Sequence, residues 1–232
     1  MLNLEQLEFI GFFDLETTGL DVKSVRIVTA SVGLLTSAGD LVQSHNWLVN
    51  PGVPIPHTAS QVHGITDEVA ERDGELPLTA VPQIIQQLEL IMARGLPVVA
   101  FNAAYDFSIL TAEARRLGLA DPLTTPVFDP LVIDRRLNKY RSGKRTLAHL
   151  AEHYQIPLLK AHTAEADAIA AARLALKQIQ LYPQIAATNA MQLHVEQSTW
   201  ADEQAADFES YMQQRSAQFK AERGWPVRNE LS

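Results

Sequence analysis

Apolar residues near the start of the chain are grouped in short continuous runs, each typical of a buried strand. The first run covers Phe9–Phe13, and longer β-rich stretches follow at Val25–Leu35 and Leu41–Val49. The turn sequence Ser37–Asp40 separates the last two. Because short connections join strands that are neighbours in the sequence, this pattern predicts a three-stranded antiparallel meander.

Farther along, apolar positions at helical spacing alternate with shorter apolar runs. The predicted helices cover Leu78–Met92, Phe107–Leu117, Leu131–Tyr140, Thr146–Tyr154 and Ala164–Gln180, and the predicted strands cover Leu96–Phe101 and Val127–Phe128. A Pro/Gly-rich loop at Asn50–Pro56 and a short helical or irregular segment at His57–Val69 precede them. Strands that come first and then alternate with helices predict an α/β domain with a mixed sheet.

The character of the sequence changes at about Pro183. The stretch Met191–Arg223 is rich in Gln and Glu and indicates a polar helix that carries several aromatic residues, with Phe219 packed on its face. We therefore expect a catalytic domain over residues 1–182 and a helical C-terminal extension over residues 183–232.

Composition limits the classes of function. The chain has 232 residues, no cysteine and a formal net charge of −8. No apolar stretch reaches the roughly 18–20 residues that span a bilayer, and the N-terminal residues lack the pattern of a signal peptide. Without cysteine there is no disulfide, thiolate metal site or cysteine nucleophile. These features fit a cytoplasmic protein with no membrane partner.

The net charge argues weakly against a protein that coats nucleic acid, but the charge is unevenly distributed. Six cationic residues surround Tyr140, namely Arg135, Arg136, Lys139, Arg141, Lys144 and Arg145. This segment is either a local phosphate-contacting patch or a solvated helix end followed by a loop.

Two carboxylates, Asp14 and Glu16, follow directly on the first apolar run. Residues two apart in a strand project from the same face, so their charges lie side by side. Near an apolar core such a pair is costly unless a cation compensates it, and oxygen-only ligands suit Mg²⁺ or Mn²⁺. The pair predicts half of a metal site, with a solvated strand end as the plain alternative.

Further candidates lie in two downstream segments. Asp106 falls at the start of a helix, where the helix dipole favours a carboxylate. Thr163 is a predicted N-cap, which places His162 in the preceding loop and Asp167 in the first turns, among alanines. Such small residues imply close packing on the sheet, an unusual place for an unpaired charge. Each of these residues alone fits a structural role equally well.

Taken together, the candidates form a coherent chemical set of four carboxylates, Asp14, Glu16, Asp106 and Asp167, with His162. Histidine titrates near neutral pH and can act as a general base towards water. Carboxylates that hold two divalent ions support hydrolysis of a phosphodiester. The set therefore indicates metal-dependent phosphodiester hydrolysis.

The same residues carry a family resemblance. The segment Phe13–Gly19 resembles the first motif of the DEDDh, DnaQ-like 3′–5′ exonucleases, which include proofreading epsilon subunits, RNase T and oligoribonuclease. The spacing of Asn102 and Asp106 matches the second motif, and that of His162 and Asp167 the third. The resemblance covers about residues 8–180. It implies a ribonuclease H-like fold with a mixed five-stranded sheet.

The resemblance also implies an activity and a set of roles. The activity is release of nucleoside 5′-monophosphates from a 3′ end with two divalent ions, Mg²⁺ or Mn²⁺. Asp14, Glu16 and Asp167 would hold the ion that carries the attacking water. Asp14 would also reach the second ion, Asp106 would support it largely through water, and His162 would be the general base.

Other residues are expected to contact the substrate. By the resemblance, these are Leu15, Thr17, Thr18 and Gly19 in the first motif, His63, Gly64 and Ile65 in a segment that closes over the terminal sugar and base, and Asn102 and Phe107 near the scissile nucleotide. The alternatives are a loop histidine beside a glycine turn, an ordinary turn asparagine and a core aromatic.

The C-terminal stretch lies outside the resemblance to the nuclease core. Trp200–Gln204 and Gly224–Val227 resemble the tail of a group of actinobacterial and phage exonuclease-domain proteins. Three functional hypotheses follow from the whole sequence: an exonuclease on single-stranded or frayed DNA with a proofreading or repair role, an RNase T- or oligoribonuclease-like exoribonuclease, or a non-catalytic module that docks to a DNA polymerase. The intact set of active-site residues favours an enzyme.

Overall fold

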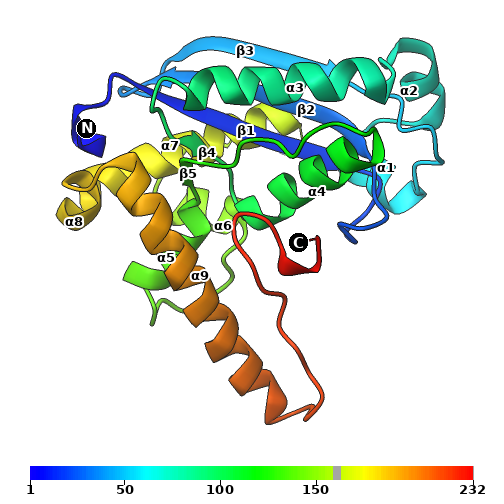
Figure 1. Cartoon of the computed structure of the whole chain (residues 1–232). Coiled ribbons are helices and arrows are strands. Elements are labelled where there is room, and N and C mark those ends of the chain that lie inside the picture. The colour runs from blue at the N-terminus through cyan, green and yellow to red at the C-terminus, as the bar shows by residue number, and fades with distance from the viewer. Residues whose placement is uncertain (159–162, 232) are drawn as a thin grey trace.

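A computed structural model describes residues 1–158 and 163–231. Within them, the centre is a five-stranded sheet of order β3-β2-β1-β4-β5. The strands are β1 (Phe9–Thr17), β2 (Ile27–Thr36), β3 (Leu41–Leu48), β4 (Val98–Val99) and β5 (Val127–Phe128). The first three pair antiparallel, and β4 and β5 run parallel to β1 (Figure 1). The predicted meander and mixed sheet are confirmed.

Helices cover both faces of this sheet (Figure 1). In the described residues they are α1 (His57–His63), α2 (Asp67–Asp73), α3 (Pro77–Met92), α4 (Ala103–Arg116), α5 (Pro130–Leu137), α6 (Leu147–His153), α7 (Ala164–Leu181), α8 (Pro183–Ala186) and α9 (Ala190–Gln213), with 3₁₀ turns η1 (Leu4–Gln6) and η2 (Asn229–Leu231). Because side chains alternate along β1, Phe13 and Leu15 pack with α3 and α4, whereas Ile10 and Phe12 pack with α7. The face of β1 that carries Phe12 also carries Asp14.

Two element boundaries differ from the prediction near the second motif. The strand expected over Leu96–Phe101 is reduced to β4, and the helix expected from Phe107 begins four positions earlier, at Ala103. The cause is the turn at Asn102, whose φ of 62° places it in the left-handed region. This turn brings the chain out of the sheet and starts α4 directly.

The C-terminal extension differs more. The helix expected over Met191–Arg223 ends at Gln213, and the chain then folds back along α9 (Figure 1). Phe219 therefore lies outside the helix and packs edge-on against Phe208, with ring centroids 5.4 Å apart. Glu209 of α9 pairs with Lys220 at 3.2 Å and with Arg223 at 3.4 Å. These ion pairs hold the returning chain segment against α9.

Helix α9 covers the edge strand β5. His194 accepts the N–H of Val127 at 3.2 Å, and Gln197, which is fully buried, accepts the N–H of Asp129 at 2.7 Å and donates to the Val127 carbonyl at 2.9 Å. These side chains satisfy backbone groups that an edge strand would otherwise leave unpaired. None of the described helices has both the length and the apolar content needed to cross a bilayer.

Candidate active site

The carboxyl end of β1 presents Asp14 and Glu16 on one face, as the alternation predicts. Both side chains are partly exposed, whereas Phe13, Leu15 and Thr17 between and beside them are buried. The pairing with β2 shifts register between Glu16 and Thr17. Such a bulge bends the strand locally and redirects its side chains, and here it falls directly after the two carboxylates.

Asp106 approaches from the first turn of α4. It is 3% exposed, and its Oδ1 accepts the backbone N–H of Leu15 at 3.1 Å. The start of α4 is held in turn by Asp129, which accepts the N–H of Asn102 at 3.1 Å and the N–H of Ala103 at 2.9 Å. Asp106 is therefore fixed both to β1 and to the turn after β4.

Asp167 approaches from the opposite face, in the first turn of α7. The Thr163 side chain accepts the N–H of Ala166 at 3.3 Å, which confirms the predicted N-cap. The buried alanines Ala168, Ala171, Ala172 and Ala175 pack against Ile10 and Phe12 of β1. Small side chains let α7 approach β1 closely, and this brings Asp167 to the same end of the sheet as Asp14. His162, the predicted general base, lies outside the described residues.

The four carboxylates line one cavity of about 430 Å³. Asp14 and Glu16 come from β1, Asp106 from α4 and Asp167 from α7. The remaining walls are supplied by Leu15, Phe101, Tyr105, Thr146, Leu147, Ala148 and Leu158. Three segments far apart in the sequence thus meet at the carboxyl ends of β1 and β4, the edge at which parallel strands commonly bind ligands.

Burial and mutual repulsion of the carboxylates raise the pKa values of the acidic residues in this cavity. Burial raises the pKa of Glu16 to about 7, and the charge of Asp167 adds to this effect. Burial also raises the pKa of Asp14 well above its usual range, and the charges of the three neighbouring carboxylates raise it further. The pKa of Asp106 is raised mainly by burial, although the Leu15 N–H bond opposes the change.

None of the ion pairs among the described residues involves Asp14, Glu16 or Asp106. Carboxylates in such a setting must either bind protons or share a cation. The donor set consists of oxygen only and fits a hard divalent ion. Within the described part of the chain, no three acidic or histidine side chains converge closely enough to hold an ion by themselves.

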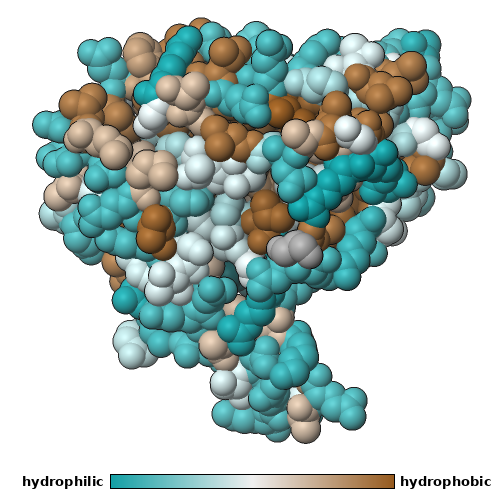
Figure 2. All heavy atoms as spheres, in the orientation of Figure 1, coloured by the Kyte–Doolittle hydropathy of each residue, from teal (hydrophilic) through white to brown (hydrophobic). Residues whose placement is uncertain are grey.

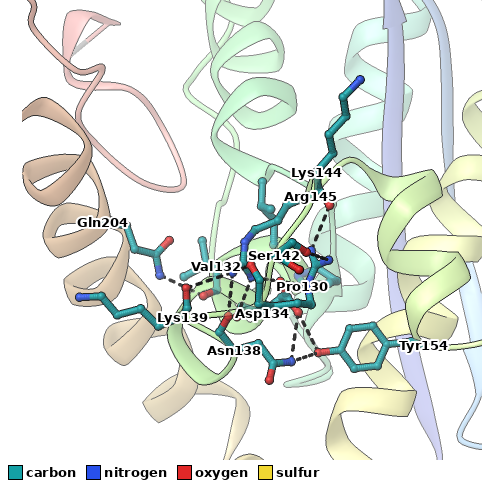
Figure 3. Close-up of polar contacts among 12 residues, drawn as sticks. Pro130, Val132, Asp134, Asn138, Lys139, Ser142, Lys144, Arg145, Tyr154 and Gln204 are labelled. Carbon is teal, nitrogen blue, oxygen red and sulfur yellow. Dashed lines mark hydrogen bonds and ion pairs between the residues drawn. The ribbon is translucent and has the colours of Figure 1, made fainter. Parts of the chain in front are cut away.

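Figure 3 shows the contacts of another buried carboxylate, Asp134 of α5, which lies before the loop that leads into one wall of the cavity. Asp134 has no exposed surface; it accepts hydrogen bonds from Tyr154 at 2.9 Å and Asn138 at 3.3 Å and forms ion pairs with Arg145 and Arg141. Arg145 also donates to four carbonyls of α5 and the following loop. This network fixes the loop that leads into the wall residues 146–148.

The basic segment around Tyr140 is therefore largely used inside the molecule. Arg141 and Arg145 neutralise Asp134, and two further cations bind the extension: Arg136 pairs with Glu203 at 2.8 Å and Lys139 with Asp207 at 2.9 Å. Of the six cations, Arg135 and Lys144 form no ion pair with described residues. The structure thus leaves much less free positive charge here than the sequence suggests.

Comparison with known proteins settles the family. The sequence model of the RNase_T exonuclease family matches residues 12–175. The chain belongs to this exonuclease family. The match confirms the resemblance to DnaQ-like, DEDDh-type exonucleases, and nucleases of this kind depend on divalent metal ions.

Curated relatives of this chain include DNA polymerase III PolC-type proteins. That of Caldanaerobacter subterraneus subsp. tengcongensis is 31% identical over 179 residues, which cover 77% of this chain and 12% of the relative. That of Streptococcus thermophilus is 29% identical over 197 residues, which cover 84% of this chain and 13% of the relative. The chain thus spans only a small part of the length of the curated relatives it matches.

Solved structures share the fold at lower identity. Exonuclease I matches with a TM-score of 0.63 and 18% identity, over 77% of this chain and 42% of that one. The nuclease domain of 3′hExo, a DEDDh family member bound to rAMP, matches with a TM-score of 0.63 and 15% identity, over 76% of this chain and 94% of that one. The ribonuclease H-like fold of this chain is confirmed.

The residues expected to contact substrate are spread over several settings. Of the first-motif residues, Leu15 lines the cavity. Thr17 contacts the Tyr105 hydroxyl at 2.7 Å and donates to the Gly19 carbonyl at 2.8 Å, while Thr18 accepts the N–H of Arg26 at 3.0 Å. These hydroxyls shape the turn after β1, so their expected role towards a nucleotide stays a prediction.

The segment around His63 closes α1. His63 is 9% exposed, its Nδ1 accepts the N–H of Ile65 at 3.1 Å, and Gly64 ends the helix with a φ of 77°. Burial lowers the pKa of His63, while a backbone hydrogen bond with Thr17 opposes the change. His63 therefore lies beside the first motif, as a group that is mainly neutral at pH 7.

Phe107, which is expected to contact the substrate, is a core aromatic in this structure, so that contact stays a prediction. Phe107 has no exposed surface and packs edge-on against Phe13, with centroids 5.3 Å apart. Because α4 begins at Ala103, Phe107 lies in the second turn of this helix. Its side chain points into the core. Asn102 is exposed but does not line the cavity of the carboxylates.

Sequence reasoning missed two features of this site. Tyr105 and Phe101 flank the carboxylates in the cavity, although both stand within or next to the second motif. Asp129, which is 1% exposed, holds the start of α4 through contacts with residues 26 and 27 positions away. The apolar run that ends in Phe128 predicts a strand, but no local pattern marks the next residue as the anchor of a distant helix.

Proposed function

We propose that this chain is a metal-dependent 3′–5′ exonuclease that releases nucleoside 5′-monophosphates from single-stranded or frayed DNA. The observation that carries the proposal is the meeting of four carboxylates, those of Asp14, Glu16, Asp106 and Asp167, in one cavity. Phosphodiester hydrolysis with two divalent ions, Mg²⁺ or Mn²⁺, is the chemistry that uses such a set.

Each acidic residue has a distinct role in this proposal. Asp14, Glu16 and Asp167 would hold one ion; Asp14 would also reach the second, which Asp106 would support largely through water. When bound, the ions would supply an activated water and neutralise negative charge. Asp106 is oriented for this by the Leu15 N–H, and Asp167 by the capped first turn of α7. His162 takes the proton of the attacking water as general base.

DNA is proposed as the substrate because the relatives at about 30% identity are PolC-type DNA polymerases. The same relationship supports a proofreading role and association with a DNA polymerase. Structural neighbours include both an exonuclease I–ssDNA complex and a 3′-exonuclease that recognises a histone mRNA stem-loop. RNA is therefore the competing substrate in the test.

The test uses matched DNA and RNA oligonucleotides with single-stranded 3′ tails, labelled at the 5′ end, with Mg²⁺, Mn²⁺ or EDTA. We expect a ladder that shortens from the 3′ end only with metal and faster on DNA. The Asp14→Asn variant should lose about a thousandfold or more. Asp73→Asn, an exposed carboxylate on α2, is the matched control and should retain full activity.

Three results would contradict parts of the proposal. Release of the labelled nucleotide first would reverse the direction of degradation. Faster degradation of RNA would assign an exoribonuclease. No degradation of either strand by a folded protein that binds the oligonucleotides would favour the non-catalytic docking module.

A further inference from the structure

A second cavity, of about 570 Å³, lies between the nuclease core and the C-terminal extension. Its core side is formed by the start of α4, by α5 and by Asp129, the residue that follows β5. Its other side is formed by α9 and the returning chain. Phe101 lines the cavity of the carboxylates, and the next residue, Asn102, lines this one. The two cavities are thus neighbours at the carboxyl ends of β1, β4 and β5.

Aromatic rings and cations line this second cavity. Phe208, which is 51% exposed, and Phe219 present rings that pack edge to face. Arg135 lines the cavity from α5 and forms no ion pair with a described residue. Exposed aromatics beside unneutralised cations are the means by which proteins bind single strands without reading sequence, since bases stack and phosphates pair with the cations.

The acidic groups of the cavity are already satisfied. Asp129 accepts hydrogen bonds from Asn102, Ala103 and Leu131 and, at 3.3 Å, from the indole of Trp225. Glu222 pairs with Arg228 at 2.9 Å. Lys220 is paired with Glu209 at 3.2 Å, so Arg135 is the cation of the cavity that has no ion pair among the described residues.

The same contacts hold the extension in place. Trp225 is 8% exposed and belongs to the core cluster that contains α3 and α4. Through Asp129 it is joined to the N–H groups that start the helix of Asp106. The wall supplied by the returning chain is therefore fixed relative to the carboxylates, although the far end of α9 projects from the body of the molecule (Figure 2).

On the basis of the proposed exonuclease function, we propose that this second cavity binds the nucleotides that precede the 3′ end of a single strand. The terminal nucleotide occupies the cavity of the carboxylates, and the strand continues past the turn at Phe101 and Asn102. Upstream bases stack on Phe208 and Phe219, and a phosphate pairs with Arg135. The extension is then a substrate-binding element that makes the enzyme prefer longer strands.

The test compares release of thymidine 5′-monophosphate from oligothymidylates of two and ten nucleotides. The measured quantity is the ratio of kcat/KM for the longer to that for the shorter strand. We expect Arg135→Gln and Phe208→Ala each to lower this ratio about tenfold, mainly through KM on the longer strand. Arg135→Gln should also reduce the salt dependence of binding of the longer strand by about 0.7 in slope.

Matched controls are available in the same chain. Arg94→Gln removes an exposed charge from the turn before β4, at the opposite end of the strands, and Tyr211→Ala removes a half-exposed aromatic of α9 that does not line the cavity. Both controls should keep the ratio of the unchanged protein. Circular dichroism would verify that all four variants are folded.

The outcomes separate this proposal from the proposed function. An unchanged ratio in both cavity variants, while the starting protein degrades both strands, overturns the second cavity and leaves the exonuclease intact. If no strand is degraded, the exonuclease proposal fails. Fluorescence anisotropy of the labelled ten-nucleotide strand then tests whether the second cavity binds single strands. Weaker binding of the strand by Arg135→Gln than by Arg94→Gln supports the proposed role of the second cavity, and equal binding overturns that role.

Discussion

Asp134 is a fully buried carboxylate and Asp14 a partly buried one, and different groups face them. Asp134 is surrounded by Arg145, Arg141 and hydroxyl and amide donors, so its charge is matched inside the protein. Asp14 faces other carboxylates, and burial together with their charges raises its pKa. A buried charge that is fully paired fixes a loop, whereas one that is left uncompensated costs stability and is suited to bind a cation.

The same substitution should have opposite effects at the two positions. Asp134→Asn leaves Arg145 without its buried partner and should lower the free energy of unfolding by about 3–5 kcal/mol. Asp14→Asn relieves repulsion and should raise it by about 1 kcal/mol in metal-free protein at pH 8. Urea unfolding in EDTA measures both. A loss of stability in both variants would contradict the difference proposed between the paired carboxylate of Asp134 and the repelled carboxylate of Asp14.

The pH dependence of stability should come from the cavity of Asp14. Glu16 has a folded pKa of about 7 against an ordinary 4.5, so its contribution is fully present below pH 4.5 and is lost as the pH rises through 7. Metal-free protein should lose about 1–2 kcal/mol between pH 5 and pH 8, after allowance for solvent screening. Thermal melts across this range provide the measurement.

Two additions sharpen this result. Glu16→Gln should flatten the curve, since the substituted group does not titrate. Mn²⁺ at pH 8 should restore the lost stability, because an ion that binds only the folded state stabilises it by mass action. A metal-free protein that is more stable at pH 8 than at pH 5 would show that these carboxylates are compensated.

The capping of α7 should link stability to activity. Thr163→Ala removes the hydrogen bond to the Ala166 N–H and should cost about 1 kcal/mol. Because Asp167 lies in the same turn, activity should fall as well. Asn189→Ala, which removes the cap of α9 at Gln192, is the control. Asn189→Ala should cost a similar amount of stability and leave kcat unchanged. Equal losses of activity in the two variants would show that the Thr163 cap has no specific effect on the position of Asp167.

The smallest effect is expected at the surface pairs that join α5 to α9. In the pair of Lys139 with Asp207, both side chains are more than half exposed. Lys139→Ala should therefore change the free energy of unfolding by less than about 1 kcal/mol, and 1 M salt should abolish the difference. A loss comparable to that of Asp134→Asn would mean that exposed pairs also fix this part of the molecule.

Much of the fold and of the acidic site follows from local patterns in the sequence. Alternation along β1 places Asp14 and Glu16 on one face, and the Thr163 cap with its following alanines places Asp167 against that face. Both patterns act within a few residues, where strand and helix geometry leave little freedom. The roles of His162 and of the ions themselves remain predictions.

What the sequence did not reveal depends on distant contacts. Asp129 meets Ala103, Gln197 and Trp225, which lie 26, 68 and 96 positions away. The partners of Arg136 and Lys139 lie 67 and 68 positions away, so the segment resembled a free basic patch. Phe107 was expected near the substrate from the family resemblance, and the left-handed turn at Asn102, which advances the start of α4, has no clear local signal.

The position of Trp225 also has a consequence for engineering a smaller nuclease. The family match ends at residue 175, inside α7, yet Ile179, Ile185, Leu193 and Trp225 beyond that point complete the two main core clusters. A fragment cut at the end of the match would expose apolar surface and remove a donor from Asp129. A shortened version of this protein therefore has to retain the chain through Trp225, because the C-terminal segment completes the hydrophobic core.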